Sequence, residues 1–213
     1  MLGHKFKDRE HAGEVLAEKL KKYRGTGAMV LALPRGGVVV GFEIAKALDL
    51  PLDVIVTKKI GHPSSSEYAI CAVNDAGKLL CNEDERKSVS KEWLREKYEL
   101  QVSEARRRVS LYRENLGPLN VSGQTVIIVD DGIATGLTMR LAIDSVKTQN
   151  AAKIIIAVPV ASMAIARVLS KEVNEFIVLL APKRFLGSVG AHYKRFEPVD
   201  DQKVVSLLKL IRR

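Results

Sequence analysis

The stretch Val126-Ile127-Ile128-Val129-Asp130-Asp131-Gly132-Ile133-Ala134-Thr135-Gly136-Leu137-Thr138 decides the fold of this chain. Its four consecutive apolar residues are typical of a buried strand in a parallel sheet. Two carboxylates follow the strand, then a loop of small and hydroxyl-bearing residues, and then helical periodicity over 139–147. Ligands of open α/β sheets bind beyond the carboxyl ends of the strands, and N–H groups at a helix N-terminus bind phosphate. The stretch therefore predicts acids for hydroxyls or a metal beside amides for a phosphate.

A second strand-to-loop transition lies upstream, where the apolar residues 29–33 run into Pro34-Arg35-Gly36-Gly37. Paired glycines let a backbone approach a ligand closely, and an arginine can bind a phosphate through two hydrogen bonds. A Gly-Gly pair alone is more often a plain turn. Its position before a helix and upstream of the acidic stretch favours a role in binding.

The segment 126–138 resembles the phosphoribosyl-pyrophosphate motif of the type I phosphoribosyltransferases. That motif consists of an apolar strand, two acids, two usually aliphatic residues and a small-Thr-Gly-x-Thr loop. Gly132 departs from it, and we expect this glycine to loosen the loop without removing a ligand. Hypoxanthine–guanine members carry an aspartate base where this chain has Ala134, whereas adenine-type members also have a small residue there. The matching positions are Asp130, Asp131, Ala134, Thr135, Gly136 and Thr138.

The resemblance implies an α/β fold, with an open parallel sheet flanked by helices. The implied activity is Mg²⁺-dependent transfer of the 5-phosphoribosyl group of phosphoribosyl pyrophosphate to a nitrogenous base, with release of pyrophosphate. Asp130 and Asp131 are expected to hold the ribose hydroxyls, directly or through Mg²⁺ and its waters. The loop residues at 134–138 are expected to bind the 5-phosphate.

The departing pyrophosphate is expected to contact the second loop and a third strand end. Arg35, Gly36 and Gly37 match the family's pyrophosphate loop, and Lys58 or Lys59 matches a phosphate-binding lysine. Adjacent lysines are also common in solvated turns. The polar residues 62–67 that follow are where related enzymes place a closing loop, which suits a mobile lid or any surface loop.

The residues after 181 are expected to form a small hood over the strand ends, beyond a core at 1–181. In this family the hood recognises the acceptor base, often by stacking on an aromatic ring, and Tyr193 and Phe185 are our candidates. Tyr193 could instead be a hydrophobic plug over the sheet, and His192 a structural polar residue rather than an acid or base. The order of motifs is similar to uncharacterised bacterial and archaeal phosphoribosyltransferase-like proteins, which identifies no acceptor.

Hydrophobic periodicity predicts the remaining frame. A hairpin is expected at 68–74 and 78–81. One long charged helix is expected at 83–116, within an insertion at about 62–117, where its apolar seam packs on the domain or on a second copy in a homodimer. A helix of that length would extend about 45 Å. Strands are predicted at 28–33, 52–58, 125–130, 153–158 and 175–180, and helices at 8–22, 38–48, 136–149, 162–171 and 204–211.

Composition limits the class of protein. The net charge of +9 suits a substrate with several phosphates, since a positive field attracts it, and nucleic acid is a minor alternative. Cys71 and Cys81 form no CxxC pair and could be neighbours on a hairpin, but we expect both to be reduced and half-buried. No signal peptide or membrane-spanning run is apparent, which predicts a cytoplasmic protein. The alternatives are a non-catalytic regulator that binds phosphoribosyl pyrophosphate or nucleotides, with or without RNA, and a Rossmann-like domain without ribose chemistry.

Overall fold

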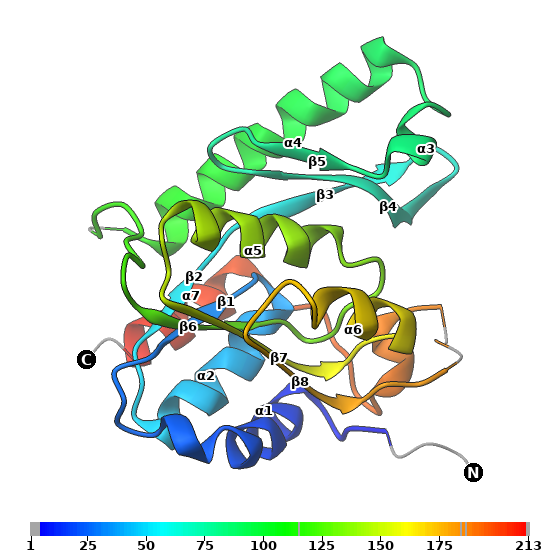
Figure 1. Cartoon of the computed structure of the whole chain (residues 1–213). Coiled ribbons are helices and arrows are strands. Elements are labelled where there is room, and N and C mark those ends of the chain that lie inside the picture. The colour runs from blue at the N-terminus through cyan, green and yellow to red at the C-terminus, as the bar shows by residue number, and fades with distance from the viewer. Residues whose placement is uncertain (1–4, 115, 184, 186, 212–213) are drawn as a thin grey trace.

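A five-stranded parallel sheet forms the centre of the computed structural model, with strand order β2-β1-β6-β7-β8 (Figure 1). The structure describes residues 5–114, 116–183, 185 and 187–211, without the side chain of Glu67. The expected open parallel sheet is confirmed. In sheet order its strands are β2 (Leu52–Val54), β1 (Met29–Ala32), β6 (Thr125–Val129), β7 (Lys153–Val160) and β8 (Glu175–Leu180).

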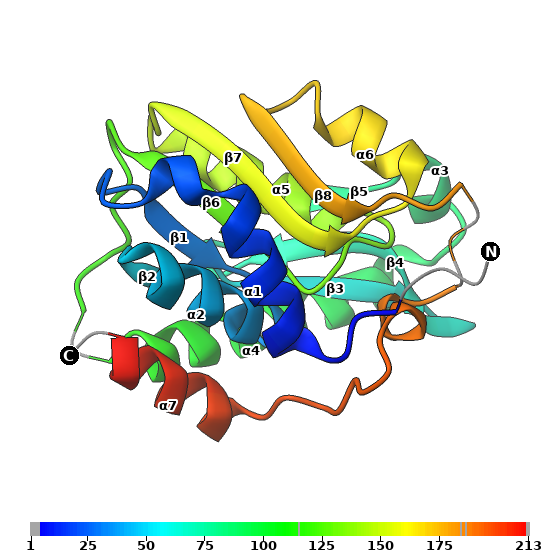
Figure 2. The same cartoon turned by 90° about the horizontal axis from the view of Figure 1, so that it is seen from below.

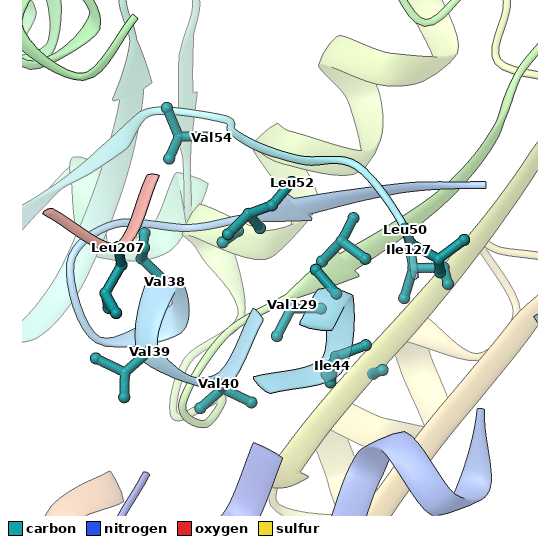
Figure 3. Close-up of a cluster of buried hydrophobic side chains, with 14 of the residues drawn as sticks. Val38, Val39, Val40, Ile44, Leu50, Leu52, Val54, Ile127, Val129 and Leu207 are labelled. Carbon is teal, nitrogen blue, oxygen red and sulfur yellow. The ribbon is translucent and has the colours of Figure 1, made fainter. Parts of the chain in front are cut away.

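Helices cover both faces of this sheet because its strands are apolar on both sides. Val30, Ile127 and Val129 face α1 (Arg9–Lys19), α2 (Gly36–Leu48) and α7 (Asp201–Ile211), and Figure 3 shows this cluster. Leu31 and Ile128 face the opposite layer, which contains α5 (Leu137–Thr148) and α6 (Met163–Leu169). Short 3-10 turns lie at Lys21–Tyr23 and Val189–His192.

A second, three-stranded antiparallel sheet lies on the far side of α5 (Figure 1). It consists of β3 (Thr57–His62), β4 (Ser65–Asn74) and β5 (Leu79–Cys81), so the expected hairpin is confirmed. The single strand expected at 52–58 is wrong. The parallel partner of β2 is β1, which ends at Ala32. The carbonyl of Ala32 accepts the last hydrogen bond between them, from Ile55 N–H. The residues from Thr57 onward then leave this sheet and pair with β4 as β3.

The region 62–67 is a hairpin rather than an irregular loop, because β3 and β4 are joined directly at Pro63 and Ser64. The single helix expected at 83–116 is also wrong. It divides into α3 (Glu83–Arg86) and α4 (Lys91–Tyr112), because the side chain of Ser90 accepts a hydrogen bond from Trp93 N–H and caps a new start. At 22 residues, α4 extends about 33 Å.

The apolar seam of α4 is buried within the chain itself. Leu94 and Val102 pack against Ile60 and Ile70 of the three-stranded sheet. Ala105 and Tyr112, at the other end of the helix, join the core beneath the five-stranded sheet. The helix therefore joins the small sheet to the main core.

The two cysteines form a disulfide, and the expectation of reduced thiols is wrong. Cys71 and Cys81 are direct cross-strand partners of β4 and β5. Cβ atoms of directly opposed residues in an antiparallel pair lie about 4.5–5.5 Å apart, which brings the two sulfurs within bonding reach. The spacing of the cysteines does not indicate this pair, because the register of the hairpin decides it.

The N-terminal segment around Phe6 meets the segment around Tyr193, which follows β8 in the chain; Figure 2 shows that α7 and the C-terminus lie on the other side of the molecule. Phe6 forms a parallel bridge with Tyr193, and its N–H donates to the carbonyl of His192 at 3.0 Å. Among the described residues, no helix is long and apolar enough to cross a bilayer.

Candidate functional site

The two acids of the 126–138 stretch follow β6 directly and point in different directions. Asp130 lines a cleft of about 350 Å³, whereas Asp131 does not belong to its lining. The carboxylate of Asp131 instead accepts a hydrogen bond from Arg9 Nε at 2.7 Å. Burial raises the pKa of Asp130 well above its usual value, and the neighbouring Asp131 adds to the effect. Burial and the adjacent carboxylate thus both disfavour the charged form of Asp130.

Arg9 is a member of this region that the sequence did not reveal. Besides Asp131 it contacts the carbonyl of Glu197, to which its Nη1 donates at 2.8 Å. Its guanidinium carbon lies 3.7 Å from the centre of the Phe196 ring, an orientation that favours a cation–π interaction. Arg9 thus connects α1, the acidic stretch and the C-terminal segment. It lies 122 positions from Asp131, with no motif around it to suggest the pairing.

The loop at 34–37 packs directly on the two acids. A Cβ at Gly37 would lie 2.9 Å from Asp130 Cα, and one at Gly36 would overlap the carboxylate of Asp131. Only glycine fits at these two positions, because a side chain at either would run into the acids on which the loop packs. The peptide bond between Pro34 and Arg35 is cis. The side chain of Arg35 does not line the cleft, and its Nη1 lies 3.7 Å from Asp201 Oδ1.

The small and hydroxyl-bearing loop is adjacent to the first turn of α5. Gly136 adopts a left-handed conformation, with φ of +82°, immediately before the helix begins at Leu137. The cleft therefore brings the loop, the helix N-terminus, Asp130 and Lys59 together. Its lining is Lys59, Ala69, Asp130, Gly132, Ile133, Ala134, Thr135, Gly136, Thr138, Gly187, Ser188, Val189, Gly190 and Phe196.

Gly132 does not leave the loop loose, contrary to our expectation. It is buried, and a Cβ there would lie 2.6 Å from Val189 Cγ1 and 2.8 Å from Val160 Cγ1. The next residue is also fixed, since Ile133 N–H donates to the carbonyl of Val160 at 2.8 Å. The space that a larger side chain would fill is taken by Val189 of the C-terminal segment.

The two candidate lysines lie on opposite faces of β3, because adjacent side chains alternate along a strand. Lys59 lines the cleft with Asp130. Lys58 faces the other way, where burial and the nearby Arg108 and Arg35 lower its pKa to about 8. The sequence could not distinguish them, because a strand's faces depend on its partners.

The aromatic candidates also separate. Tyr193 is 4% exposed, and its hydroxyl donates to the carbonyl of Asp131 at 2.6 Å. Burial raises the pKa of Tyr193, which keeps this hydroxyl protonated. Phe185 packs against His192, with ring centres 5.0 Å apart. Phe196, which the sequence did not single out, is the aromatic residue in the cleft lining.

Comparison with known proteins relates this geometry to a family. A family model described as phosphoribosyl transferase domain matches residues 6–183. The chain belongs to the phosphoribosyl transferase family. The matched region includes Arg9, both acids and the loop at 134–138, while most of the C-terminal segment, with Phe196, lies beyond it.

Relatives within this family include two sequences from strains of Mycobacterium tuberculosis, each provisionally named a phosphoribosyl transferase. Each is 35% identical over 213 residues, which covers 98% of this chain and 47% of the relative. The chain therefore spans about half the length of these curated relatives. The crystal structure of TT1426 from Thermus thermophilus has 36% sequence identity and a TM-score of 0.76, covering 96% of this chain and 97% of that one.

Proposed function

We propose that this phosphoribosyl transferase family member transfers the 5-phosphoribosyl group of phosphoribosyl pyrophosphate to a nitrogenous base. The observation that carries the proposal is the cleft that joins Asp130, Lys59 and the loop at 134–138. Its N–H and hydroxyl groups at a helix N-terminus suit a 5-phosphate, and its carboxylate suits the ribose hydroxyls. In this proposal, residues 1–181 form the transferase core and residues 182–213 the acceptor side.

Transfer at the anomeric carbon breaks the bond to pyrophosphate and forms one to a ring nitrogen of the base. The protein's share of such a reaction is to position the two reactants and to stabilise charge. The loop at 134–138 would anchor the sugar phosphate, and Asp130 would orient the ribose. Arg35 and a lysine of β3 would stabilise the negative charge on the leaving group.

Mg²⁺ fits the oxygen chemistry of this cleft. Asp130 supplies a hard carboxylate oxygen in the lining of the cleft. The described residues contain no cluster of three or more His, Cys, Asp or Glu that could enclose a metal. Mg²⁺ is commonly bound through one or two carboxylates together with substrate phosphates and waters. Asp130 would hold the ion in this way, and when bound the ion would neutralise charge on the pyrophosphate.

The acceptor base would lie at the end of the cleft formed by residues 187–190 and Phe196. The ring of Phe196 contacts Arg9, whose guanidinium carbon lies 3.7 Å from the ring centre, and Tyr193, whose ring centre lies 4.9 Å away. An aromatic ring that is half-buried in the lining of a cleft can stack with a planar base. We therefore place base stacking at Phe196, and assign to Tyr193 the support of the Asp131 backbone.

Calorimetric titration with phosphoribosyl pyrophosphate, with and without Mg²⁺, tests the proposal. We expect Mg²⁺-dependent binding, and we expect Asp130→Asn to weaken it by at least about tenfold, or 1.4 kcal/mol. The matched control is Asp144→Asn. Asp144 lies on α5 outside the cleft, and its carboxylate forms an ion pair with Lys78. Equal binding by both variants and the wild type would disprove the role of Asp130.

Turnover is measured separately, as pyrophosphate released in the presence of a panel of purine and pyrimidine bases. Phe196→Leu should raise the KM for the accepted base while leaving the affinity for phosphoribosyl pyrophosphate unchanged. Phe185→Leu, which alters a ring outside the cleft lining, serves as the control. Binding without release from any base would mean that the chain is a sensor of the sugar phosphate and not a transferase.

A further inference from the structure

The outer strand of the three-stranded sheet, β5, has one edge that pairs with no other strand within the described part of the chain. Its inner edge pairs with β4, in a register that places Leu80 opposite Ala72. The helices α4 and α5 pack on the two faces of this sheet (Figure 1). An unpaired edge presents backbone N–H and C=O groups that another extended chain can bind.

The register determines which backbone groups of β5 point outward. The residues that flank the strand, Lys78 and Asn82, are hydrogen-bonded to β4 at 3.2 Å and 2.9 Å. Hydrogen-bonded and non-hydrogen-bonded positions alternate along an antiparallel pair of strands. Leu80 is therefore bonded to β4 as well, whereas Leu79 and Cys81 direct their N–H and C=O groups away from it. Among the described residues, these outward groups have no hydrogen-bond partner.

A groove of about 780 Å³ lies beside this edge, between β5 and the segment that contains α3 and α4. Leu79, Val89 and Leu94 supply its apolar surface, and Leu79 is 39% exposed. Tyr98 fixes the position of α4 against the hairpin turn, since its hydroxyl donates to the carbonyl of Gly77 at 2.8 Å. The groove is called the β5 groove below.

The β5 groove is on the face of the sheet that α4 covers. Leu79 is the cross-strand partner of Val73, which packs with Leu94 and Val102 of α4. Because side chains alternate along a strand, a strand added to β5 would direct every second side chain to this face. Those side chains would enter the groove. It thus offers contacts that the three residues of β5 could not supply through their backbone alone.

The charged residues of the β5 groove are mainly basic. Arg86 pairs with Glu83 at 3.3 Å. Lys91 and Arg95 have no ion-pair partner within the part of the chain that the structure describes. Opposite charge across an interface speeds association and disfavours wrong partners, so this surplus favours an acidic partner. The charged lining consists of four cations and one carboxylate, namely Arg86, Lys87, Lys91, Arg95 and Glu83.

We propose that the edge of β5 and the β5 groove bind an acidic, extended segment of another protein, which adds to the sheet as a fourth strand. A second copy of this chain fits less well, because it would bring the same four cations beside one another. A nucleic acid also fits less well, because it cannot match the N–H and C=O groups of a strand edge.

The disulfide between Cys71 and Cys81 prepares this edge for a partner. It joins β5 covalently to β4, so the strand is already extended before anything binds. A binding surface that is ordered in advance loses less conformational entropy on association. The site shares no lining residue with the cleft around Asp130, so the proposal goes beyond the transferase reaction and does not depend on it.

Selection on the full chain from a displayed library of peptides of about six residues, with glutamate at every second position, tests the site. Fluorescence anisotropy then gives the affinity of the selected peptides. Lys91→Glu should weaken binding by about tenfold and preserve the fold, because an acid suits the first residue of α4. Lys171→Glu, at an exposed position outside the groove, makes the same change in net charge and should have little effect. A library without binders, or equal affinities for the two variants, would overturn the proposal.

Pairing with the backbone of β5 is tested on the selected peptide itself. N-methylation of every second residue removes the donors that face β5, whereas N-methylation of the remaining residues removes donors that face away. Only one of these two sets should weaken binding, by about tenfold or more. Equal losses from both sets, or no loss from either, would exclude the addition of a strand.

The matching change in the protein is Leu79→Pro, which removes an outward N–H. An edge strand tolerates proline where its N–H is not bonded to the neighbouring strand, so the urea midpoint should stay close to that of Leu79→Ala. Leu79→Pro should bind the peptide more weakly than Leu79→Ala, which keeps the N–H. Equal affinities in variants of equal stability would refute the pairing.

The same variants distinguish the other occupants of the edge. A dimer of the chain in analytical ultracentrifugation that Leu79→Pro dissociates would assign the edge to a second copy. A labelled oligouridylate that displaces the peptide, and whose binding depends on Lys91 but not on Leu79, would assign the groove to nucleic acid. Either result would overturn the proposal. Asp130→Asn should leave peptide binding unchanged, so this inference and the proposed function can fail separately.

Discussion

Asp131 and Arg9 show what residue-level patterns can and cannot reveal. The two acids could be predicted because their neighbours in the chain form a local motif. The arginine that balances Asp131 could not, because it lies 122 positions away in a helix with ordinary periodicity. The same limit applies to Phe196, which enters the cleft only through the path of the C-terminal segment. The spacing of residues within a short segment cannot reveal a contact with a residue that is distant in the sequence.

Removal of the Arg9 side chain should destabilise the protein. The side chains of Arg9 and Asp131 are 11% and 15% exposed, so Arg9→Met leaves a nearly buried carboxylate without its partner. We expect a loss of about 3 kcal/mol in the free energy of unfolding. Urea denaturation followed by circular dichroism measures it. Asp131→Asn in the Arg9→Met background should recover part of the loss, and a double variant with no recovery would contradict the pairing.

A side chain at position 132 should lower the stability of the folded protein, because there is no space for it. Gly132→Ala places a methyl group against Val189 and Val160, and overpacking of this kind costs about 1–3 kcal/mol. Val189→Ala should relieve part of that cost when combined with it. Thermal unfolding of the two single variants and of the double variant gives the coupling free energy between positions 132 and 189. Strictly additive effects would show that Val189 is not the obstacle.

At the scale of elements, the sequence predicted which segments are helical or extended better than where they end. The strand at 175–180 was correct to the residue. The errors at 52–58 and 83–116 have physical causes outside local periodicity. In one case a partner strand ends, and in the other Ser90 caps a new helix in a segment free of proline and glycine. The error at 83–116 falls within the insertion at about 62–117, whereas the error at 52–58 lies just before it.

The cap of α4 can be tested by a single exchange of serine for alanine. Ser90→Ala removes the acceptor for Trp93 N–H and should lower the free energy of unfolding by about 1 kcal/mol. Ser103→Ala, at an exposed position in the same helix, should change it by no more than a few tenths. Chemical denaturation of both variants measures the difference. An equal response from the two serines would indicate that α3 and α4 can join into one helix.

At the scale of the molecule, alternation of strands and helices predicted the parallel sheet, because right-handed crossovers leave few topologies for that order. It did not predict a second sheet held between α5 and α4 (Figure 1). That layer depends on pairing between β3, β4 and β5, and on a disulfide set by their register. Pairing across a hairpin is local enough to predict, whereas the surface on which the hairpin packs is not.

The net charge of +9 should make anion binding sensitive to salt. Screening shortens the reach of the positive field, so the affinity for pyrophosphate should fall by about tenfold between roughly 0.05 M and 0.5 M potassium chloride. Isothermal titration at several salt concentrations measures this slope. Sucrose of matched osmolality should leave the affinity unchanged. An affinity that does not change with salt would show that pyrophosphate is held by contacts other than the attraction of the positive field.

The opposite orientations of Lys58 and Lys59 have a consequence for the length of β3 between the lysines and the turn at Pro63 and Ser64. That turn fixes the register of β3 on β4, and successive side chains of a strand alternate, so the face of each lysine depends on whether its distance from the turn is odd or even. Insertion of a single residue between Lys59 and Ile60 would exchange the faces that the two ammonium groups occupy, and insertion of two would restore them. An insertion in the link at Ile55 and Val56 would leave both faces unchanged. The constraint on this strand is therefore one of parity rather than of composition.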